Sequence, residues 1–259
     1  MMQFSVLGSG SKGNSVLIRE GATAILIDAG FSAREISRRL AAVNVDVAEL
    51  SAILVTHEHS DHIRGVAVLS RQGRLPVFAN AATFRAAGDR LADLDSCREF
   101  ATGSSFVFQD LQIHPFSVSH DAADPVGFVI KNGSCTLGYC TDTGKISQLM
   151  LHRLTGCHGL ILESNHDLEM LQNGSYPPFL KQRVRSNLGH LANGDTASMI
   201  QKLVHDSLQH VVLAHISEKN NRPEIACETV RRVLPANHRI SVVTASQDQA
   251  GPLVTLGRP

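Results

Sequence analysis

The stretch HEHSDH, residues 57–62, decides how the rest of this sequence is interpreted. It follows an apolar run, residues 52–56, that is typical of a buried strand, and a helix is predicted to begin near Asp61. His57 and His59 alternate on an extended segment, so their side chains can point to the same side. Imidazole binds zinc, iron and similar metals, and a carboxylate adds tolerance for harder ions. Four candidate ligands within six residues exceed what one open site needs, so the stretch predicts a dinuclear metal centre.

Three more potential ligands follow predicted strands farther along the chain. His120, Asp142 and His215 each stand just after a β run. Sites in layered folds collect where strands end. A single histidine at one of these points would more often be structural, but three such residues together with the 57–62 stretch indicate one metal centre.

The predicted elements favour the α/β class. Strands occur in both halves of the chain, with helices at intervals near residues 33–43, 146–154, 195–206 and 223–234. This alternation predicts two sheets with helices outside them, a four-layered αββα sandwich. Because no repeat, linker or change of composition marks a boundary, we predict one domain over residues 1–259.

Composition excludes several classes of protein. Lys+Arg and Asp+Glu both total 24, so the chain is not a globally basic nucleic-acid binder, although a local basic groove remains allowed. No apolar run approaches ~18 residues, so no membrane span is predicted. The beginning of the chain lacks a secretory signal, and the five cysteines form no C-x-x-C pair. We therefore expect a cytoplasmic protein with reduced thiols.

A glycine-rich stretch near the beginning imitates a dinucleotide-binding motif. GSGSKG, residues 8–13, matches G-x-G-x-x-G and follows a strand. That motif requires a helix next, whereas residues 14–28 predict a strand, a turn and another strand. We interpret the stretch as a tight turn between strands, which near a site can still present backbone N–H groups or Lys12 to a phosphate.

The ligand order resembles that of the metallo-β-lactamase superfamily of αββα hydrolases. The match extends from Asp28 to His215 and includes the H-x-H-x-D-H pattern. The resemblance implies that Asp28 orients the histidine loop. It also implies a ligand set in which one ion takes His57, His59 and His120, the other takes Asp61, His62 and His215, and Asp142 bridges the two.

The dinuclear centre alone does not choose between thioester, lactam and phosphodiester substrates. The 73 positions from Asp142 to His215 leave no room for a β-CASP insertion, and the 44 residues after His215 hold no long helical substrate domain. Lys181 and Arg185 share a predicted helix face with Arg183 close by. These cations either line a groove for a nucleic-acid backbone or form a solvated helix face.

Proton transfer to the leaving oxygen requires an acid or a metal. His166 and His190 are candidates because both lie in polar loops. Together with Asp61, they form the predicted catalytic set.

Several longer motifs narrow the resemblance to the YycJ/WalJ-like branch: GSGSKGNS, SVSHDA, GYCTDTG, ESNHD, LKQRVRSNLGHLAN and HISEKNN. Proteins of this branch are described as metal-dependent 5′→3′ DNA exonucleases. The resemblance implies a phosphodiesterase that acts on DNA ends through a metal-bridging hydroxide. The His and Asp ligands suit two zinc, manganese or iron ions, and the sequence does not choose among these metals.

Other functions share parts of this pattern. A thioester or lactone hydrolase of the same fold, similar to glyoxalase II, would use all seven ligands. A diiron redox module is disfavoured because those modules resemble H-x-E-x-D, and position 59 is histidine here. A metal-free scaffold is disfavoured because the predicted ligand set is complete.

Overall fold

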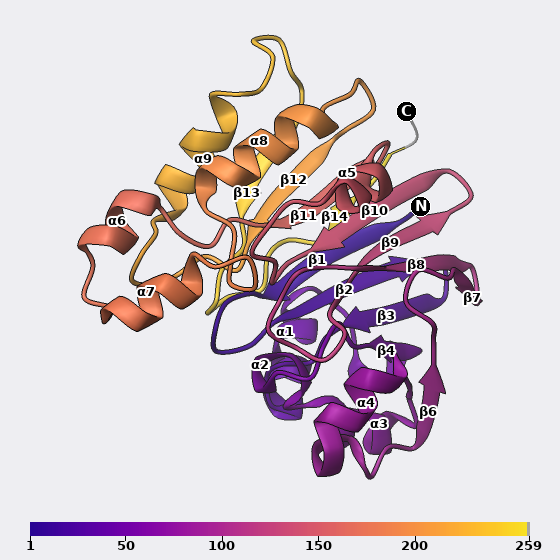
Figure 1. The fold of residues 1–259 in the computed structure, drawn as a ribbon. Helices are drawn as coiled ribbons and strands as arrows, with labels where there is room; N and C mark the ends of the chain where they lie inside the picture. Colours follow the sequence, from indigo (N-terminus) through magenta and orange to yellow (C-terminus); the bar gives the residue numbers. More distant parts are fainter. Residues whose placement is uncertain (258–259) are drawn as a thin grey trace.

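Two seven-stranded sheets packed face to face form the centre of the molecule, a computed structural model that describes residues 1–257 (Figure 1). Residues 258–259 of the predicted domain lie outside the described part. In spatial order, the first sheet contains β14 (Val254–Thr255), β1 (Gln3–Gly8), β2 (Ser15–Glu20), β3 (Thr23–Ile27), β4 (Ala52–Leu54), β5 (Pro76–Ala79) and β6 (Ser96–Glu99). The second contains β13 (Ser241–Thr244), β12 (His210–Ala214), β11 (Gly159–Glu163), β10 (Cys135–Cys140), β9 (Val126–Asn132), β8 (Leu111–Ser117) and β7 (Phe106–Phe108).

Helices cover the outer face of each sheet, which confirms the predicted αββα sandwich. The first sheet carries α1 (Ala33–Ala42), α2 (Ser60–Ile63), α3 (Val66–Gly73), α4 (Ala81–Ala87) and the short 3₁₀ turns η1 (Val47–Glu49) and η2 (Gly88–Leu91). The second carries α5 (Gln148–Leu154), α8 (Asn193–Leu203) and α9 (Pro223–Arg231). Two short helices, α6 (Leu168–Asn173) and α7 (Pro178–Val184), project to one side (Figure 1).

Successive side chains along a strand pack into different layers of the sandwich. Ile25 and Ile27 of β3 pack in the core between the sheets, whereas Leu26 packs in the core under the helices. Successive side chains of a strand point to opposite faces, so both faces of β3 are buried. Strands β3–β6 are parallel neighbours, and so are β10–β13. Their carboxyl ends therefore deliver loops to one edge of each sheet.

The structure differs from the sequence prediction in the region after residue 60. The sequence predicts a single helix that begins near Asp61 and stops before Gly73, but the structure has two helices, α2 and α3, separated at Gly65. The Gly65 amide donates to the Ala29 carbonyl at 2.7 Å, and a Cβ here would lie 2.3 Å from the Phe31 carbonyl oxygen. This close approach breaks the helix and fixes the loop that follows β3.

Four short elements were not predicted from the sequence: β5, α4, β6 and α6. β6 reads SCRE and lies at the edge of its sheet, where three of its four residues are exposed. An edge strand needs no apolar run, so hydrophobic periodicity does not reveal it. No helix within residues 1–257 is both long and apolar enough to cross a membrane.

Arg39 ties three distant segments together beneath the loop of residues 8–14. Its guanidinium donates to the Leu7 carbonyl at 2.7 Å and to the Gln247 carbonyl at 3.0 Å. It also pairs with Glu35 at 2.7 Å and lies 3.9 Å from the centre of the Phe31 ring. The side chain is buried, so these contacts are largely shielded from water.

Arg39→Ala is expected to lower the free energy of unfolding by about 3 kcal/mol, because the buried Leu7 carbonyl and the partly buried Gln247 carbonyl lose their donor. Urea unfolding with a common m-value measures this change. Arg38→Ala is the matched control, since Arg38 pairs with the same Glu35 but is exposed. It should leave the urea midpoint unchanged, and equal losses in the two variants would contradict the anchoring role of Arg39.

Candidate metal centre

Potential ligands gather where strands of both sheets end. Asp28 follows β3, Asp142 follows β10 and His215 follows β12. All three have left-handed backbones, with φ of 61°, 56° and 55°. This conformation costs free energy in a residue with a Cβ and is concentrated at functional sites. Here it turns the chain sharply, directly after each strand.

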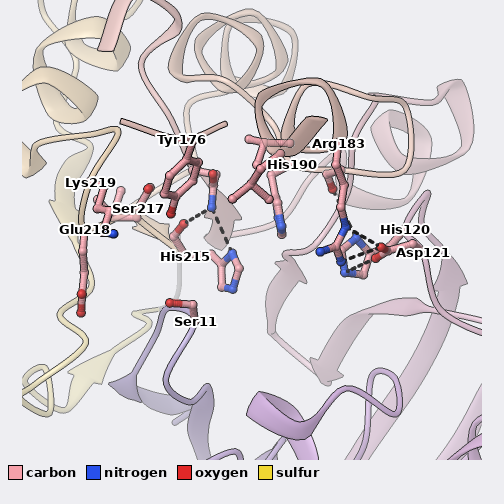
Figure 2. Close-up of a pocket in the computed structure, with 15 residues that line it drawn as sticks. Ser11, His120, Asp121, Tyr176, Arg183, His190, His215, Ser217, Glu218 and Lys219 are labelled. Carbon is pink, nitrogen blue, oxygen red and sulfur yellow. Dashed lines mark hydrogen bonds and ion pairs between the residues drawn. The ribbon is translucent and has the colours of Figure 1, made fainter. Parts of the chain in front are cut away.

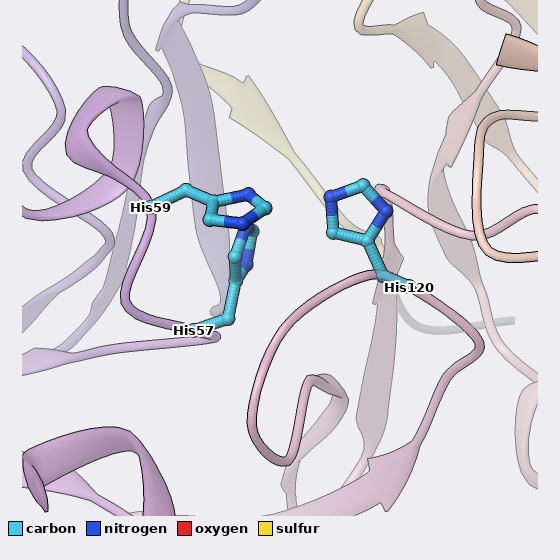
Figure 3. A group of neighbouring side chains, drawn as sticks. All are labelled: His57, His59 and His120. Carbon is cyan, nitrogen blue, oxygen red and sulfur yellow. The ribbon is translucent and has the colours of Figure 1, made fainter. Parts of the chain in front are cut away.

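His57, His59 and His120 converge on one point from opposite sides of the sandwich (Figure 3). The ring centres of His57 and His59 are 4.6 Å apart, and those of His59 and His120 are 5.0 Å apart. His57 and His120 are buried and His59 is half-buried. The structure thus brings together the three residues predicted to hold one ion.

A second group lies beside the first. One atom each from Asp61, His62 and His215 lies within 4.8 Å of the others. The Asp142 carboxylate stands between the groups: its Oδ2 is 3.5 Å from His62 Nε2, and its Oδ1 is 3.4 Å from His215 Nε2. Asp142 Oδ1 is also 4.0 Å from His120 Nε2. The Asp142 carboxylate thus lies between the two predicted ligand groups, and its bridging of two ions stays a prediction.

The chemistry of these donors fits metal ions. Among the described residues 1–257, His57 Nε2, Asp142 Oδ2 and His215 Nε2 are buried without a hydrogen-bond partner. Each unsatisfied buried group costs about 1–3 kcal/mol unless something binds it. Burial, followed by the neighbouring imidazoles of His62 and His120, lowers the pKa of His57 well below its usual value. The ring is then neutral, which is the form that binds metals.

Other polar groups hold the ligand rings in place. Asp28 Oδ2 is 2.8 Å from His62 Nδ1, and the same carboxylate accepts from the Thr56 amide at 2.9 Å. His120 Nδ1 is 3.1 Å from the Leu188 carbonyl. In both histidines this contact fixes the Nδ1 proton and leaves Nε2 to bind a metal. The orienting position expected for Asp28 is the one the structure shows.

Two asparagines also contact these residues: Asn14, which the sequence analysis missed, and Asn165, which the sequence suggests only as a group that positions His166, His190 or a phosphate. Asn14, in the glycine-rich turn, donates to Asp61 Oδ2 at 3.2 Å and lies 3.1 Å from His62 Nε2. Asn165 donates to the His215 carbonyl at 2.9 Å. The turn joins β1 to β2, as the sequence predicts, and it places Asn14 against the candidate metal centre.

Glu163 is a further residue that the sequence analysis missed. It is fully buried at the end of β11, and its Oε1 lies 2.6 Å from His190 Nδ1 and 3.3 Å from His215 Nδ1. Its position as the last residue of a strand, close to where Asp142 and His215 follow theirs, was the signal that could have revealed it. Although burial acts to raise the pKa of Glu163, the adjacent His190 and His215 lower it below its usual value.

The two histidines predicted to transfer protons occupy different places. His190 faces the metal centre, with Nδ1 3.9 Å from Asp142 Oδ1. A tight turn delivers it: a Cβ on Gly189 would lie 2.3 Å from the Arg183 carbonyl oxygen. His166, by contrast, is 1% exposed and does not line the adjoining cavity. Its burial lowers its pKa to about 4.

A cavity of about 250 Å³ opens beside the cluster (Figure 2). His120, His190 and His215 lie at its inner end, with α7 on one wall and the 216–219 loop on the other. Arg183 reaches to the rim, where its guanidinium donates to Asp121 Oδ2 at 2.7 and 3.0 Å. A cation thus stands at the cavity mouth, close to the predicted ligand His120.

The three basic residues singled out on α7 do not act as one face. Arg183 lines the cavity, whereas Lys181 Nζ donates to the Gln172 carbonyl at 2.8 Å. Arg185 is exposed and stands outside the cavity lining. Of these three cations, Arg183 is the one placed where it could contact a nucleic-acid backbone in the cavity.

Comparisons with known proteins agree with this geometry. Residues 23–216 match the family model described as the beta-lactamase superfamily domain. The chain is 38% identical over 235 residues to exodeoxyribonuclease YycJ of Bacillus anthracis, covering 90% of this chain and 89% of that protein. It is 37% identical over 263 residues to exodeoxyribonuclease WalJ of Streptococcus pneumoniae, covering 98% of both. The crystal structure of the metallo-beta-lactamase fold protein YhfI from Bacillus subtilis matches with a TM-score of 0.76 at 16% identity, covering 97% of this chain and 99% of that one.

Proposed function

The chain belongs to the metallo-β-lactamase superfamily, as a YycJ/WalJ-like member, and we propose that it is a metal-dependent exonuclease that acts on DNA ends. The observation that carries the proposal is the convergence of seven His and Asp side chains beside a cavity with a cation at its mouth. Relatives similar over most of the chain are named exodeoxyribonucleases, which supports DNA as the substrate. On the family resemblance, the direction we propose is 5′→3′.

In this proposal two divalent ions, of zinc, manganese or iron, occupy the two groups of ligands. When bound, such ions supply a nucleophilic water near neutral pH and neutralise charge on the phosphodiester. Among the protein groups, Asp142 would offset part of the charge of both ions, and Asp28 with Asn14 holds His62 and Asp61 in place. These roles follow from the contacts of each side chain.

His190 is the acid that we assign to the leaving oxygen. It borders the cavity, and its other ring position is held by the Glu163 carboxylate at 2.6 Å. Glu163 thereby keeps a proton on Nδ1 and leaves Nε2 to exchange a proton with substrate. We leave His166 out of this assignment because it is buried outside the cavity.

A nuclease assay tests the proposal. Purified protein and an Asp61→Ala control are incubated with 5′- and 3′-labelled single- and double-stranded DNA in the presence of manganese or zinc. We expect stepwise loss of nucleotides from one end, absent in the control. Silence on DNA together with turnover of acyl-glutathione or lactone substrates would replace the proposal with an acyl hydrolase.

Arg183 is expected to hold the phosphate backbone at the cavity mouth. Its ion pair with Asp121 is partly exposed and is weak enough for a phosphate to share the guanidinium. Arg183→Ala should weaken DNA binding and reduce the slope of log Kd against log salt concentration by about one. Arg185→Ala, on the same segment but outside the cavity, is the control. If the salt dependence of Kd is the same in Arg183→Ala as in the wild type, Arg183 does not contact the DNA backbone.

We also propose a cytoplasmic location. All five cysteines are unpaired, and four of them are buried. Free thiols of this kind are typical of reducing compartments.

A further inference from the structure

The outer part of the cavity carries an aromatic side chain that the proposed chemistry does not use. Tyr176 is half-buried and lies on the side of Ser217 and Lys219, whereas Arg183 lies on the other side, beside His120 (Figure 2). Leu180 and Ile216 also line this part of the cavity. A polar reaction centre therefore opens into a partly apolar slot with one ring on its wall.

Local structure fixes the position of Tyr176. It is followed by Pro177, the N-cap of α7, and Pro178, the first residue of that helix. Because each proline locks its own φ, the chain after Tyr176 has little freedom. Lys219 Nζ lies 5.7 Å from the centre of the tyrosine ring, within the range of a cation–π contact. The backbone that follows Tyr176 is thus restricted, and a cation lies near its ring.

Charge around the slot favours an anionic ligand with a flat apolar group. Arg183 stands on the wall nearest His120, and Lys219 stands at the outer end beside Tyr176. Of the two acids that line the cavity, Asp121 pairs with Arg183 and Glu218 pairs with Lys12 at 2.5 Å. Within residues 1–257 Lys219 forms no ion pair, so its ammonium is available to a phosphate.

We propose that this slot receives the terminal nucleotide of the DNA strand, with its base stacked on Tyr176 and a neighbouring phosphate on Lys219. The inference rests on the proposed exonuclease function and deepens it. A single ring accommodates one base, which must leave its own stack and its pairing partner. The enzyme should therefore prefer single-stranded or frayed ends to blunt duplex ends. It should also tolerate all four bases, because every base presents a π face.

Changing the enzyme and the substrate in combination tests whether the terminal base stacks on Tyr176. Wild type and Tyr176→Ala are compared on two single-stranded oligonucleotides, one ordinary and one with an abasic terminal nucleotide. On the ordinary strand we expect kcat/KM of Tyr176→Ala to fall by about 10-fold to 100-fold, the range of a lost base–aromatic stack. On the abasic strand the two enzymes should have equal kcat/KM. Tyr176→Phe keeps the ring and should restore activity on the ordinary strand.

Phe179→Ala is the matched control, because Phe179 is an aromatic three positions away that is 72% exposed and outside the cavity lining. It should leave kcat/KM unchanged on both strands. If Tyr176→Ala loses equal activity on the ordinary and abasic strands, then Tyr176 has a structural role. That result would overturn base stacking on Tyr176 and leave the exonuclease function in place. Failure of the wild type to cleave either strand, with turnover of an acyl substrate, would overturn the exonuclease function and the platform with it.

Discussion

Asp142→Asn is expected to lower kcat on DNA by about 10³-fold and to reduce the metal content of the purified protein, because the substitution removes the charge between the two ligand groups. Asparagine has nearly the same shape as aspartate and tolerates a left-handed backbone, so the φ of 56° at position 142 can be kept. The change therefore tests the carboxylate rather than the fold. Elemental analysis gives the metal stoichiometry, and steady-state kinetics gives kcat.

The control for Asp142→Asn is the reverse exchange at an exposed site. Asn44 has φ of 58° and is exposed after α1. Asn44→Asp should leave both metal content and kcat unchanged. Wild-type kcat in Asp142→Asn would contradict a bridging role, and full metal content with lost activity would assign the carboxylate to the reaction rather than to metal binding.

His190→Ala is expected to lower kcat on DNA by about 10²–10⁴-fold with metal content unchanged, since general acid catalysis contributes rate acceleration of this size. Glu163→Gln should cause a smaller loss, about 10-fold to 100-fold, because Glu163 acts through His190 and His215. On bis(p-nitrophenyl) phosphate the defect of His190→Ala should shrink. Its phenolate leaving group departs without a proton, so it does not need the acid.

His152→Ala supplies the comparison for His190→Ala, since His152 is an exposed histidine on α5. Its kcat should equal that of the wild type on both substrates. If His190→Ala loses metal, His190 is a ligand, a role that its place in the group with Asp142, Glu163 and His215 would also allow. If its defect is equal on DNA and on the activated diester, then His190 does not act as the acid.

The layers of the fold were predictable because the signals for them are local. The strands that the sequence predicts over residues 111–119 and 126–131 form over 111–117 and 126–132, and the helices near 33–43 and 223–234 form as expected. The elements that escaped prediction are short or polar, as in β6 and α6. The break at Gly65 escaped because its cause is a backbone contact with the loop at residues 29–31.

The sequence by itself determined the identity and order of the candidate ligands. The seven His and Asp residues stand beside β runs, and the structure gathers their side chains into neighbouring groups. That they bind two ions stays a prediction. Their visibility has a physical cause: strands of a layered fold end at a common edge, so polar residues after successive strands are brought together whatever lies between them.

Only the tertiary structure decided what surrounds these ligands. It separated His190, at the cavity, from the buried His166, although both lie in polar loops of the sequence. It also found Glu163 beside His190, 27 positions away, and Asn14 beside Asp61, 47 positions away. Tyr176 lines the same cavity as His120 and His215 only in the folded chain. Such pairings depend on distances through space between segments far apart in the chain, and no local pattern of residues encodes those distances.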